Sequence, residues 1–192
     1  MTDESHQSES GFEYIPSQEQ KEKLELLQSV ITSLQKKGVR FAIAGGYGLD
    51  ALYGSLTRNH KDYDFVVFDD SEESFREVVT KLGFNHNSIK ESGTVVFNHG
   101  EVGVELEYMP ASKVQEFLQN AGVVGIDLES DEIASSGELN GVNVPTFNLE
   151  TYRMFDSLQN ERFENPDPHA PHKQRVYDAL GTRDNSPNNE GI

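Results

Sequence analysis

Hydrophobic residues in the first part of the chain change from helical spacing to a continuous run. Apolar residues three and four positions apart predict a helix that opens at Ser17, where Gln20 completes a capping box, and that stops at Gly38. The run from Val39 to Ala44 is too short for a helix and predicts a buried strand that ends at Gly45-Gly46. The apolar stripe of the helix is Leu24, Leu27, Ile31 and Leu34.

Predicted helices and strands continue to alternate along the next forty residues of the chain. Residues 47–53 predict one or two helical turns closed by Gly54, and residues 62–68 predict a second strand. Asp70 and Glu73 then predict the cap of another helix. The stripe of that helix, with the glycine that stops it, is Phe75, Val78, Val79, Leu82 and Gly83.

Strand patterns return in the second half of the chain. Residues 94–97 and 102–109 alternate apolar and polar positions around an Asn-His-Gly turn, which predicts a hairpin. Residues 111–121 predict a short helix, and Asn140-Gly141 is the favoured two-residue turn of a second hairpin. Two further predicted helices follow, at residues 149–160 and 168–180. This order of elements predicts an α+β or mixed α/β fold.

The length of 192 residues fits one domain. Residues 1–15 and 182–192 are polar, which predicts disordered tails around a single domain at 16–181. No run approaches the roughly 18 apolar residues of a membrane span, and the first residues lack a signal-peptide pattern, so we expect a cytoplasmic protein. Cysteine is absent, which excludes disulfides and thiol chemistry.

Acidic residues outnumber basic ones and give a formal net charge of −17. Part of this charge lies in residues 1–20, which hold five acids and no Lys or Arg. Affinity for nucleic acids rests mainly on Lys and Arg that neutralise phosphates, so the balance argues against RNA or DNA as a partner. Two interpretations remain: a well-solvated acidic surface, or a substrate that is small and cationic.

Two carboxylates, Asp62 and Asp64, stand one residue apart at the start of the second predicted strand. The two-residue period of a strand places both on the same face. Like charges this close repel, and burying them without compensation costs on the order of several kcal/mol. A hard cation with oxygen ligands relieves that repulsion. The pair therefore predicts either a metal site or a polar strand face.

A third acid comes from the strand at 102–109, where Glu105 and Glu107 share one face. If this strand lies beside the Asp62 strand, one of the two completes a three-carboxylate cluster that suits Mg²⁺. Two such ions about 4 Å apart would activate an attacking hydroxyl and stabilise the leaving oxygen of an in-line displacement. Taken alone, the two glutamates are more typical of a solvent-facing strand.

The spacing of these groups resembles that of one enzyme family. Two glycines, eleven residues, then Arg58-x-His60-x-Asp62-x-Asp64 and a later strand acid resemble the nucleotidyltransferases of the DNA polymerase β-type fold. Within them, the segment is most similar to the aminoglycoside and lincosamide branch. Ten positions match in order, which makes the motif specific. They are Gly45, Gly46, Tyr47, Asp50, Gly54, Thr57, Arg58, His60, Asp62 and Asp64.

The resemblance implies a small mixed sheet flanked by helices, with a core at residues 39–110 and an acceptor-side portion at 111–181. It also implies transfer of a nucleoside monophosphate from an NTP, expected to be ATP, to an acceptor hydroxyl, with release of pyrophosphate. Asp62 and Asp64 would be Mg²⁺ ligands. The family's third acid falls on Glu107, which we prefer to Glu105 and which would also act as general base.

Six further residues complete the implied site. The backbone of Gly45-Gly46 would cradle the triphosphate. Arg58 is a fixed positive fork suited to phosphate or to the acids, and a surface ion pair is the alternative. His60 is expected to order its loop beside the nucleotide, while Asp50 ties the short helix to that loop. Lys173 would reach the triphosphate, although a solvated helix face explains it equally well.

Three functional hypotheses follow from these residues. The first is an Mg²⁺- and NTP-dependent enzyme with a small-molecule acceptor. The second keeps the chemistry but uses RNA or a protein as acceptor, as in toxin-type nucleotidyltransferases. The third is a non-catalytic nucleotide-binding module. Retention of all three acid positions argues against the third, since a binding module gains nothing from their mutual repulsion.

Overall fold

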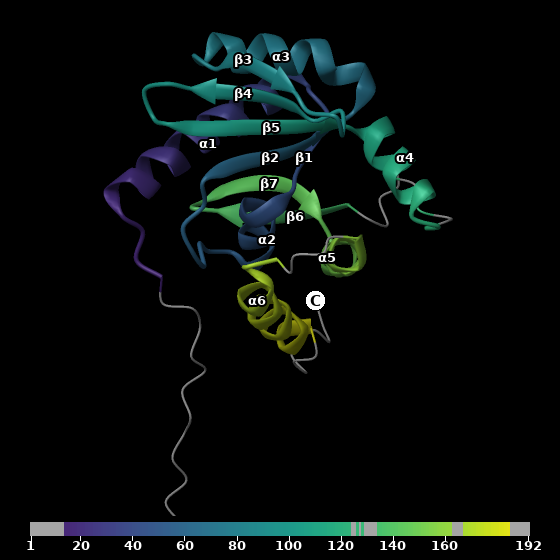
Figure 1. The fold of residues 1–192 in the computed structure, drawn as a ribbon. Coiled ribbons are helices and arrows are strands. Elements are labelled where there is room, and N and C mark those ends of the chain that lie inside the picture. The colour runs from purple at the N-terminus through teal and green to yellow at the C-terminus, as the bar shows by residue number, and fades with distance from the viewer. Residues whose placement is uncertain (1–13, 124–125, 127, 129–133, 163–166, 185–192) are drawn as a thin grey trace, which may run out of the picture.

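The computed structural model describes residues 14–123, 126, 128, 134–162 and 167–184. Its strands are β1 (Phe41–Ile43), β2 (Asp62–Val67), β3 (Asn85–Ile89), β4 (Val95–His99), β5 (Val104–Pro110), β6 (Ala134–Leu139) and β7 (Val142–Phe147). They form one sheet in the order β3-β4-β5-β2-β1-β7-β6 (Figure 1). Strand β2 is antiparallel to β1 and parallel to β5, while β1 is parallel to β7. The sheet is therefore mixed, which confirms the predicted fold class.

Helices cover both faces of this sheet. They are α1 (Gln18–Lys37), α2 (Gly45–Tyr53), α3 (Glu72–Lys81), α4 (Ala111–Asn120), α5 (Leu149–Arg162) and α6 (Ala170–Asp184), with a 3₁₀ turn η1 (Asp69–Ser71) before α3. Helices α1 and α3 lie on one face, and α4, α5 and α6 lie on the other (Figure 1). Helix α2 packs against β2, β6 and β7. Among the described residues, no helix is long and apolar enough to cross a membrane.

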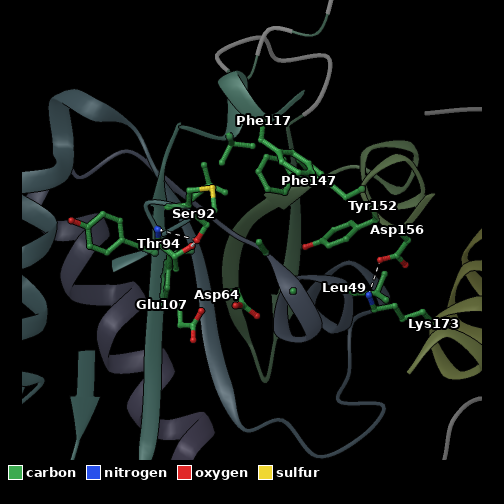
Figure 2. A pocket seen from close by; sticks show the side chains of 18 of the residues that line it. Leu49, Asp64, Ser92, Thr94, Glu107, Phe117, Phe147, Tyr152, Asp156 and Lys173 are labelled. Atoms are coloured by element: carbon green, nitrogen blue, oxygen red, sulfur yellow. Dashed lines mark hydrogen bonds and ion pairs between the residues drawn. The ribbon is translucent and has the colours of Figure 1, made fainter. Parts of the chain in front are cut away.

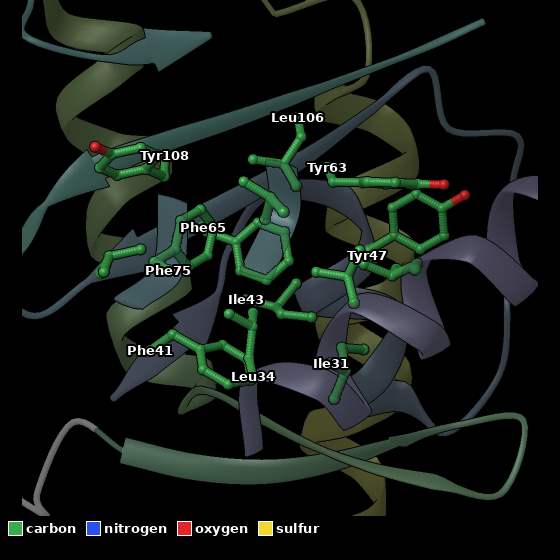
Figure 3. Close-up of a cluster of buried hydrophobic side chains, with 14 of the residues drawn as sticks. Ile31, Leu34, Phe41, Ile43, Tyr47, Tyr63, Phe65, Phe75, Leu106 and Tyr108 are labelled. Carbon is green, nitrogen blue, oxygen red and sulfur yellow. The ribbon is translucent and has the colours of Figure 1, made fainter. Parts of the chain in front are cut away.

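Side chains of the central strands face two hydrophobic clusters in alternation. Phe65 of β2 packs with α1 and α3, whereas the next residue, Val66, faces the cluster under α4 and α6. Figure 3 shows the first cluster, where the rings of Phe41 and Phe75 lie 5.8 and 5.4 Å from that of Phe65. Burial of each such ring contributes roughly 1.5–3 kcal/mol. Because side chains alternate along a strand, Asp64 shares the face of Val66.

Helix α1 begins and ends where its sequence predicts. The Ser17 hydroxyl accepts a hydrogen bond from the Gln20 backbone N–H at 3.2 Å, and Gly38 closes the helix with a φ of 74°. The prediction that the Gln20 side chain completes a capping box is wrong. Instead, the buried Gln20 side chain donates to the Tyr47 hydroxyl and accepts from the His60 backbone N–H at 3.0 Å. Gln20 therefore joins α1 to α2 and to the loop before β2.

Both predicted hairpins are confirmed. Strands β4 and β5 pair antiparallel, and β6 and β7 join through Asn140 and Gly141, whose φ angles are 50° and 80°. The second hairpin enlarges the main sheet, because β7 pairs with β1 at Ile43 and Thr146. The structure also adds β3, which the sequence pattern did not predict. All of its residues are exposed, so it carries no apolar alternation and is held by pairing with β4.

Several helix boundaries differ from the prediction: α2 begins at Gly45 rather than at residue 47, and α3 and α6 differ as well. Asp70 does not cap α3: the turn η1 intervenes, and the N-cap residue Ser71 makes no side-chain capping bond. Asp70 lies 3.4 Å from Arg40 instead. Helix α6 continues to Asp184, beyond the start of the tail predicted at 182. The remainder of that tail, and residues 1–13 of the other one, lie outside the described residues.

Candidate active site

Parallel pairing of β2 and β5 brings the predicted acids side by side. Asp62 is the register partner of Glu105, and Asp64 is the partner of Glu107. The expectation that these strands are neighbours is therefore confirmed. All four carboxylates alternate with the large core residues of their strands, so they share the sheet face that carries α5 and α6.

These four carboxylates form an array of two rows, Asp62 with Glu105 and Asp64 with Glu107, and the rows differ in exposure. Asp62 and Glu105 are exposed, whereas Asp64 and Glu107 are half-buried and line a cavity of about 410 Å³. Figure 2 shows their carboxylates on adjacent strands at one end of this cavity. Of the two glutamates on β5, Glu107 therefore lines the cavity, and Glu105 is exposed.

The rest of the cavity has one charged wall and one apolar wall. The charged wall is formed by Asp156 of α5 and Lys173 of α6, and the Tyr152 ring lies next to it (Figure 2). Ser92 and Thr94, which precede β4, also line the cavity (Figure 2). The apolar wall consists of Met109, Val114, Phe117, Phe147 and Phe155. A mostly apolar pocket with a few convergent polar groups is typical of a small-molecule site.

Withdrawal from water makes Asp64 a weak acid. Burial raises the pKa of Asp64 to about 7, and the charges of Asp62 and Glu107 add to the rise. The ammonium groups of Lys90 and Lys173 oppose it. A cation that reaches this environment stabilises the ionised form of the carboxylate.

Lys90 is a cation that already lies at this array. Its ammonium donates to both carboxylate oxygens of Glu107, at 2.5 and 2.7 Å. Among the described residues, no three His, Asp or Glu side chains lie close enough together to hold a metal ion. The donor chemistry nevertheless fits Mg²⁺, because Asp62, Asp64 and Glu107 offer hard oxygen atoms on one face of neighbouring strands.

Gly45 and Gly46 allow the backbone to approach the acids and the preceding loop. A Cβ on Gly45 would lie 1.9 Å from Asp64 Oδ2. On Gly46 it would lie 2.2 Å from His60 Nδ1 and 2.8 Å from Arg58 Nη2. Gly45 lines the cavity and begins α2, whose N-cap residue makes no side-chain capping bond. The first N–H groups of this helix are suited to bind an anion.

A buried polar network fixes the loop that precedes β2. Asp50 accepts hydrogen bonds from the backbone N–H and the hydroxyl of Thr57, at 3.0 and 2.5 Å. His60 Nε2 lies 2.6 Å from Asp50, and His172 Nε2 lies 2.8 Å from the Thr57 hydroxyl. Asp50 therefore ties α2 to the loop, as predicted, and His60 is buried within it. The network also connects the loop to α6.

The two predicted basic residues have different surroundings. The Arg58 guanidinium donates to the Asn59 carbonyl at 2.9 Å and lies against Gly46. The Lys173 ammonium lies 2.6 Å from Asp156 and 2.9 Å from Asp167. Burial would lower the pKa of Lys173, but these two carboxylates outweigh it and raise the pKa. Lys173 is thus a held cation in the cavity wall rather than part of a solvated helix face.

Comparison with known families explains this arrangement of acids, glycines and cavity. The sequence pattern of the aminoglycoside-2''-adenylyltransferase family matches residues 26–169. The chain belongs to this family. As a member of the aminoglycoside-2''-adenylyltransferase family, it is a nucleotidyltransferase of the aminoglycoside and lincosamide branch. No curated protein sequence matches the chain.

Solved structures share the fold of this family member. The solution structure of the antibiotic-resistance factor ANT(2'')-Ia is 16% identical, with 85% of this chain and 87% of that chain covered and a TM-score of 0.66. The crystal structure of ANT(2'')-Ia with adenylyl-2''-tobramycin is also 16% identical, covers 84% and 98%, and has a TM-score of 0.61. The lincosamide antibiotic adenylyltransferase LnuA, bound to lincomycin, is 14% identical, covers 81% and 96%, and has a TM-score of 0.62.

Several residues in or beside the cavity of this family member carry no signal in the sequence. Lys90 follows a strand that has no apolar alternation, so no pattern indicated that it reaches Glu107. Asp156 pairs with Lys173 across two helices, a contact that no helical spacing predicts. The aromatic residues of β7 and α5 fall in segments for which the sequence predicted only a hairpin and a helix. The Asn-Gly turn was the one signal that could have indicated the β7 wall.

Proposed function

We propose that the protein transfers a nucleoside monophosphate, expected to be AMP from ATP, to a hydroxyl of a small-molecule acceptor and releases pyrophosphate, with Mg²⁺ as cofactor. The observation that carries this proposal is the meeting of Asp64 and Glu107 beside Gly45 in one cavity. Family membership supports the same reaction class.

Each group of the site has a role in this proposal. Asp62, Asp64 and Glu107 would hold Mg²⁺, which offsets negative charge and polarises the phosphoryl oxygens when bound. The first N–H groups of α2, at Gly45 and Gly46, would receive the triphosphate because helix N-termini bind anions. Glu107 also faces the cavity, where it would accept the proton of the acceptor hydroxyl.

Cations near the glycines complete the donor side of the proposed site. Lys173 lines the cavity and would approach the triphosphate while Asp156 and Asp167 hold its ammonium in place. Arg58 lies against Gly46 and would add a fixed positive charge near the phosphates. His60 would act indirectly, since its buried ring supports Gly46 and contacts Asp50.

The acceptor is proposed to be a small molecule with a substantial apolar part. The wall that contains Phe117, Phe147 and Phe155 supports this, because aromatic walls bury ligand surface in small-molecule sites. The net charge of −17 favours a cationic acceptor by long-range attraction. The solved relatives that hold adenylyl-2''-tobramycin and lincomycin support acceptors of the antibiotic type.

A labelling experiment tests the proposal. The protein is incubated with Mg²⁺, each of the four NTPs labelled at the α-phosphate, and a panel of aminoglycosides, lincosamides and hydroxyl-bearing metabolites. We expect label on a small molecule, equimolar pyrophosphate, and no product in EDTA. Asp62→Asn and Asp64→Asn should each lower the rate by roughly 100-fold or more, since each removes a charge that the transition state needs.

Glu105 provides a matched control for Glu107 on the same strand face. Glu107→Gln should abolish transfer, whereas the exposed Glu105→Gln variant should retain most of it. A product formed by both aspartate variants would remove the catalytic assignment. Label on RNA or on a protein would instead support a toxin-type enzyme. NTP binding without pyrophosphate release, for every acceptor tried, would support a non-catalytic module.

A further inference from the structure

The ion pair between Lys90 and Glu107 spans the sheet rather than one helix. Lys90 follows β3 and Glu107 lies on β5, so β4 separates the two residues. Lys90 is backbone-paired with Thr94, while Glu107 is opposite Val96, so the lysine side chain reaches diagonally across β4. Half of the Lys90 side chain is exposed, whereas Glu107 is only 16% exposed. The ammonium therefore reaches inward to a cavity carboxylate.

The hairpin turn between β3 and β4 fixes the origin of this side chain. The Lys90 backbone N–H donates to the Thr94 carbonyl at 2.8 Å, and the Gly93 N–H donates to the Lys90 carbonyl at 2.9 Å. Gly93 has a φ of 86°, which suits a tight turn. Ser92 of the same turn lines the cavity. Lys90 is thus held at the cavity edge by the backbone and reaches Glu107 with a flexible stem.

The second cation that acts on these carboxylates is already held elsewhere. Lys173 also influences Asp64, but Asp156 and Asp167 bind its ammonium. The Lys90 ammonium instead pairs with Glu107, which lies directly opposite Asp64 in the strand register. Lys90 therefore supplies the positive charge that is in direct contact with Glu107, the register partner of Asp64.

We infer that Lys90 is a built-in counter-ion of Glu107, which a divalent cation must displace before Asp62, Asp64 and Glu107 can bind it together. This inference rests on the proposed function of those three acids. An ammonium that donates to both oxygens of a carboxylate occupies one lone pair on each oxygen, and its positive charge repels a second cation that approaches the same group. Lys90 therefore competes with the metal and weakens metal binding to the free protein.

Metal binding without nucleotide tests this competition. The full chain is titrated with Mn²⁺, and free Mn²⁺ is followed by electron paramagnetic resonance. Lys90→Met should tighten the Mn²⁺ dissociation constant by about fivefold, since a partly exposed ion pair contributes about 1 kcal/mol. Lys90→Arg keeps the charge and the reach, so its dissociation constant should remain close to that of the wild type. Circular dichroism confirms that each variant is folded.

Lys113 provides a matched control for the loss of one positive charge. It lies on α4, its side chain is 51% exposed against 50% for Lys90, and its ammonium lies 2.8 Å from Glu116. Lys113→Met should leave the Mn²⁺ dissociation constant unchanged. If Lys90→Met matches Lys113→Met, or binds Mn²⁺ more weakly than the wild type, the inference is wrong. Weaker binding would mean that Lys90 orients Glu107 for the metal.

Asp64→Asn separates failure of this inference from failure of the proposed function. It should remove the Mn²⁺ site in both the wild-type and the Lys90→Met background. If the wild type binds no Mn²⁺ that depends on Asp64, the proposed metal site and the inference are both overturned. If binding depends on Asp64 but not on Lys90, only the inference is overturned.

Discussion

Gly45 and Asp64 lie in direct contact, so that a methyl group on the glycine would overlap the carboxylate. The added Cβ would lie 1.9 Å from Oδ2 and 2.7 Å from Cγ of Asp64. Gly45 also has a φ of 58°, which L side chains rarely adopt. The glycine is therefore required twice, by its backbone conformation and by its distance from a carboxylate of the proposed metal site.

Gly45→Ala should lower both stability and activity. The clash must displace Asp64 or the start of α2, so we expect a loss of about 3 kcal/mol in the free energy of unfolding. Nucleotide transfer should fall by at least about tenfold, because the carboxylate moves. Urea unfolding and the labelling assay measure these two effects.

Gly38→Ala is the control for backbone strain alone. Gly38 closes α1 with a φ of 74°. A methyl group added there would have open space around it, with no atom of the described residues outside its own turn within 4 Å. The substitution should cost about 1 kcal/mol and leave activity intact. Equal stability losses in the two variants would contradict the contact with Asp64.

Asp64→Asn should stabilise the protein at neutral and alkaline pH while it abolishes activity. The pKa of Asp64 is raised to about 7 by burial and by Asp62 and Glu107, whereas the unfolded chain has the ordinary value. Above pH 7 the ionised, half-buried carboxylate lowers the free energy of unfolding. Removing it should raise the free energy of unfolding by about 2 kcal/mol in EDTA, or several degrees in melting temperature.

The sign of this effect sets its pH dependence. Between about pH 4 and pH 7, folded Asp64 binds a proton that the unfolded chain has lost, so wild-type stability falls as the pH rises through this window. The gain from Asp64→Asn should vanish near pH 4. Thermal melts from pH 4 to 8 measure it, and a gain that is constant over this range would contradict the raised pKa.

Asp50 and Thr57 should show strong energetic coupling. Each buried group loses hydrogen bonds when the other is changed, so Asp50→Asn and Thr57→Val should each cost about 2 kcal/mol. The double variant should lose roughly 1–2 kcal/mol less than the sum of the two. As a control, Asp70→Asn breaks an exposed pair with Arg40 and should cost less than about 0.5 kcal/mol. Additive losses at Asp50 and Thr57 would show that the network is not cooperative.

Lys173→Met should raise the KM for the NTP more than it lowers kcat. The substitution removes the ammonium from the cavity wall and leaves Asp156 and Asp167 without their shared partner. Stability should fall by about 1 kcal/mol, and Lys173→Arg should recover part of both losses. Steady-state kinetics at varied NTP concentration check this. An unchanged KM would limit Lys173 to a structural role.

Elements with strong local patterns were predictable from the sequence. The Leu24 to Leu34 stripe, Gly38 and the Asn140-Gly141 turn each specify a local conformation by periodicity or by φ. Strand β3 was not predictable, because all its residues are exposed and it is held to the sheet by pairing with β4. The same limit applies to Gln20. Its position suggested a capping box, but a buried contact with Tyr47 and His60 competes successfully for its side chain.

The sequence by itself determined the strand that carries Asp62 and Asp64, the glycines before it, and the family motif that joins them, because these features are close in the chain and obey local periodicity. Tertiary structure alone decided which row of acids lies in the cavity, since strand register pairs Asp64 with Glu107. It also decided the partner of Lys90. Contacts between distant segments depend on sheet order and side-chain reach, which no local spacing encodes.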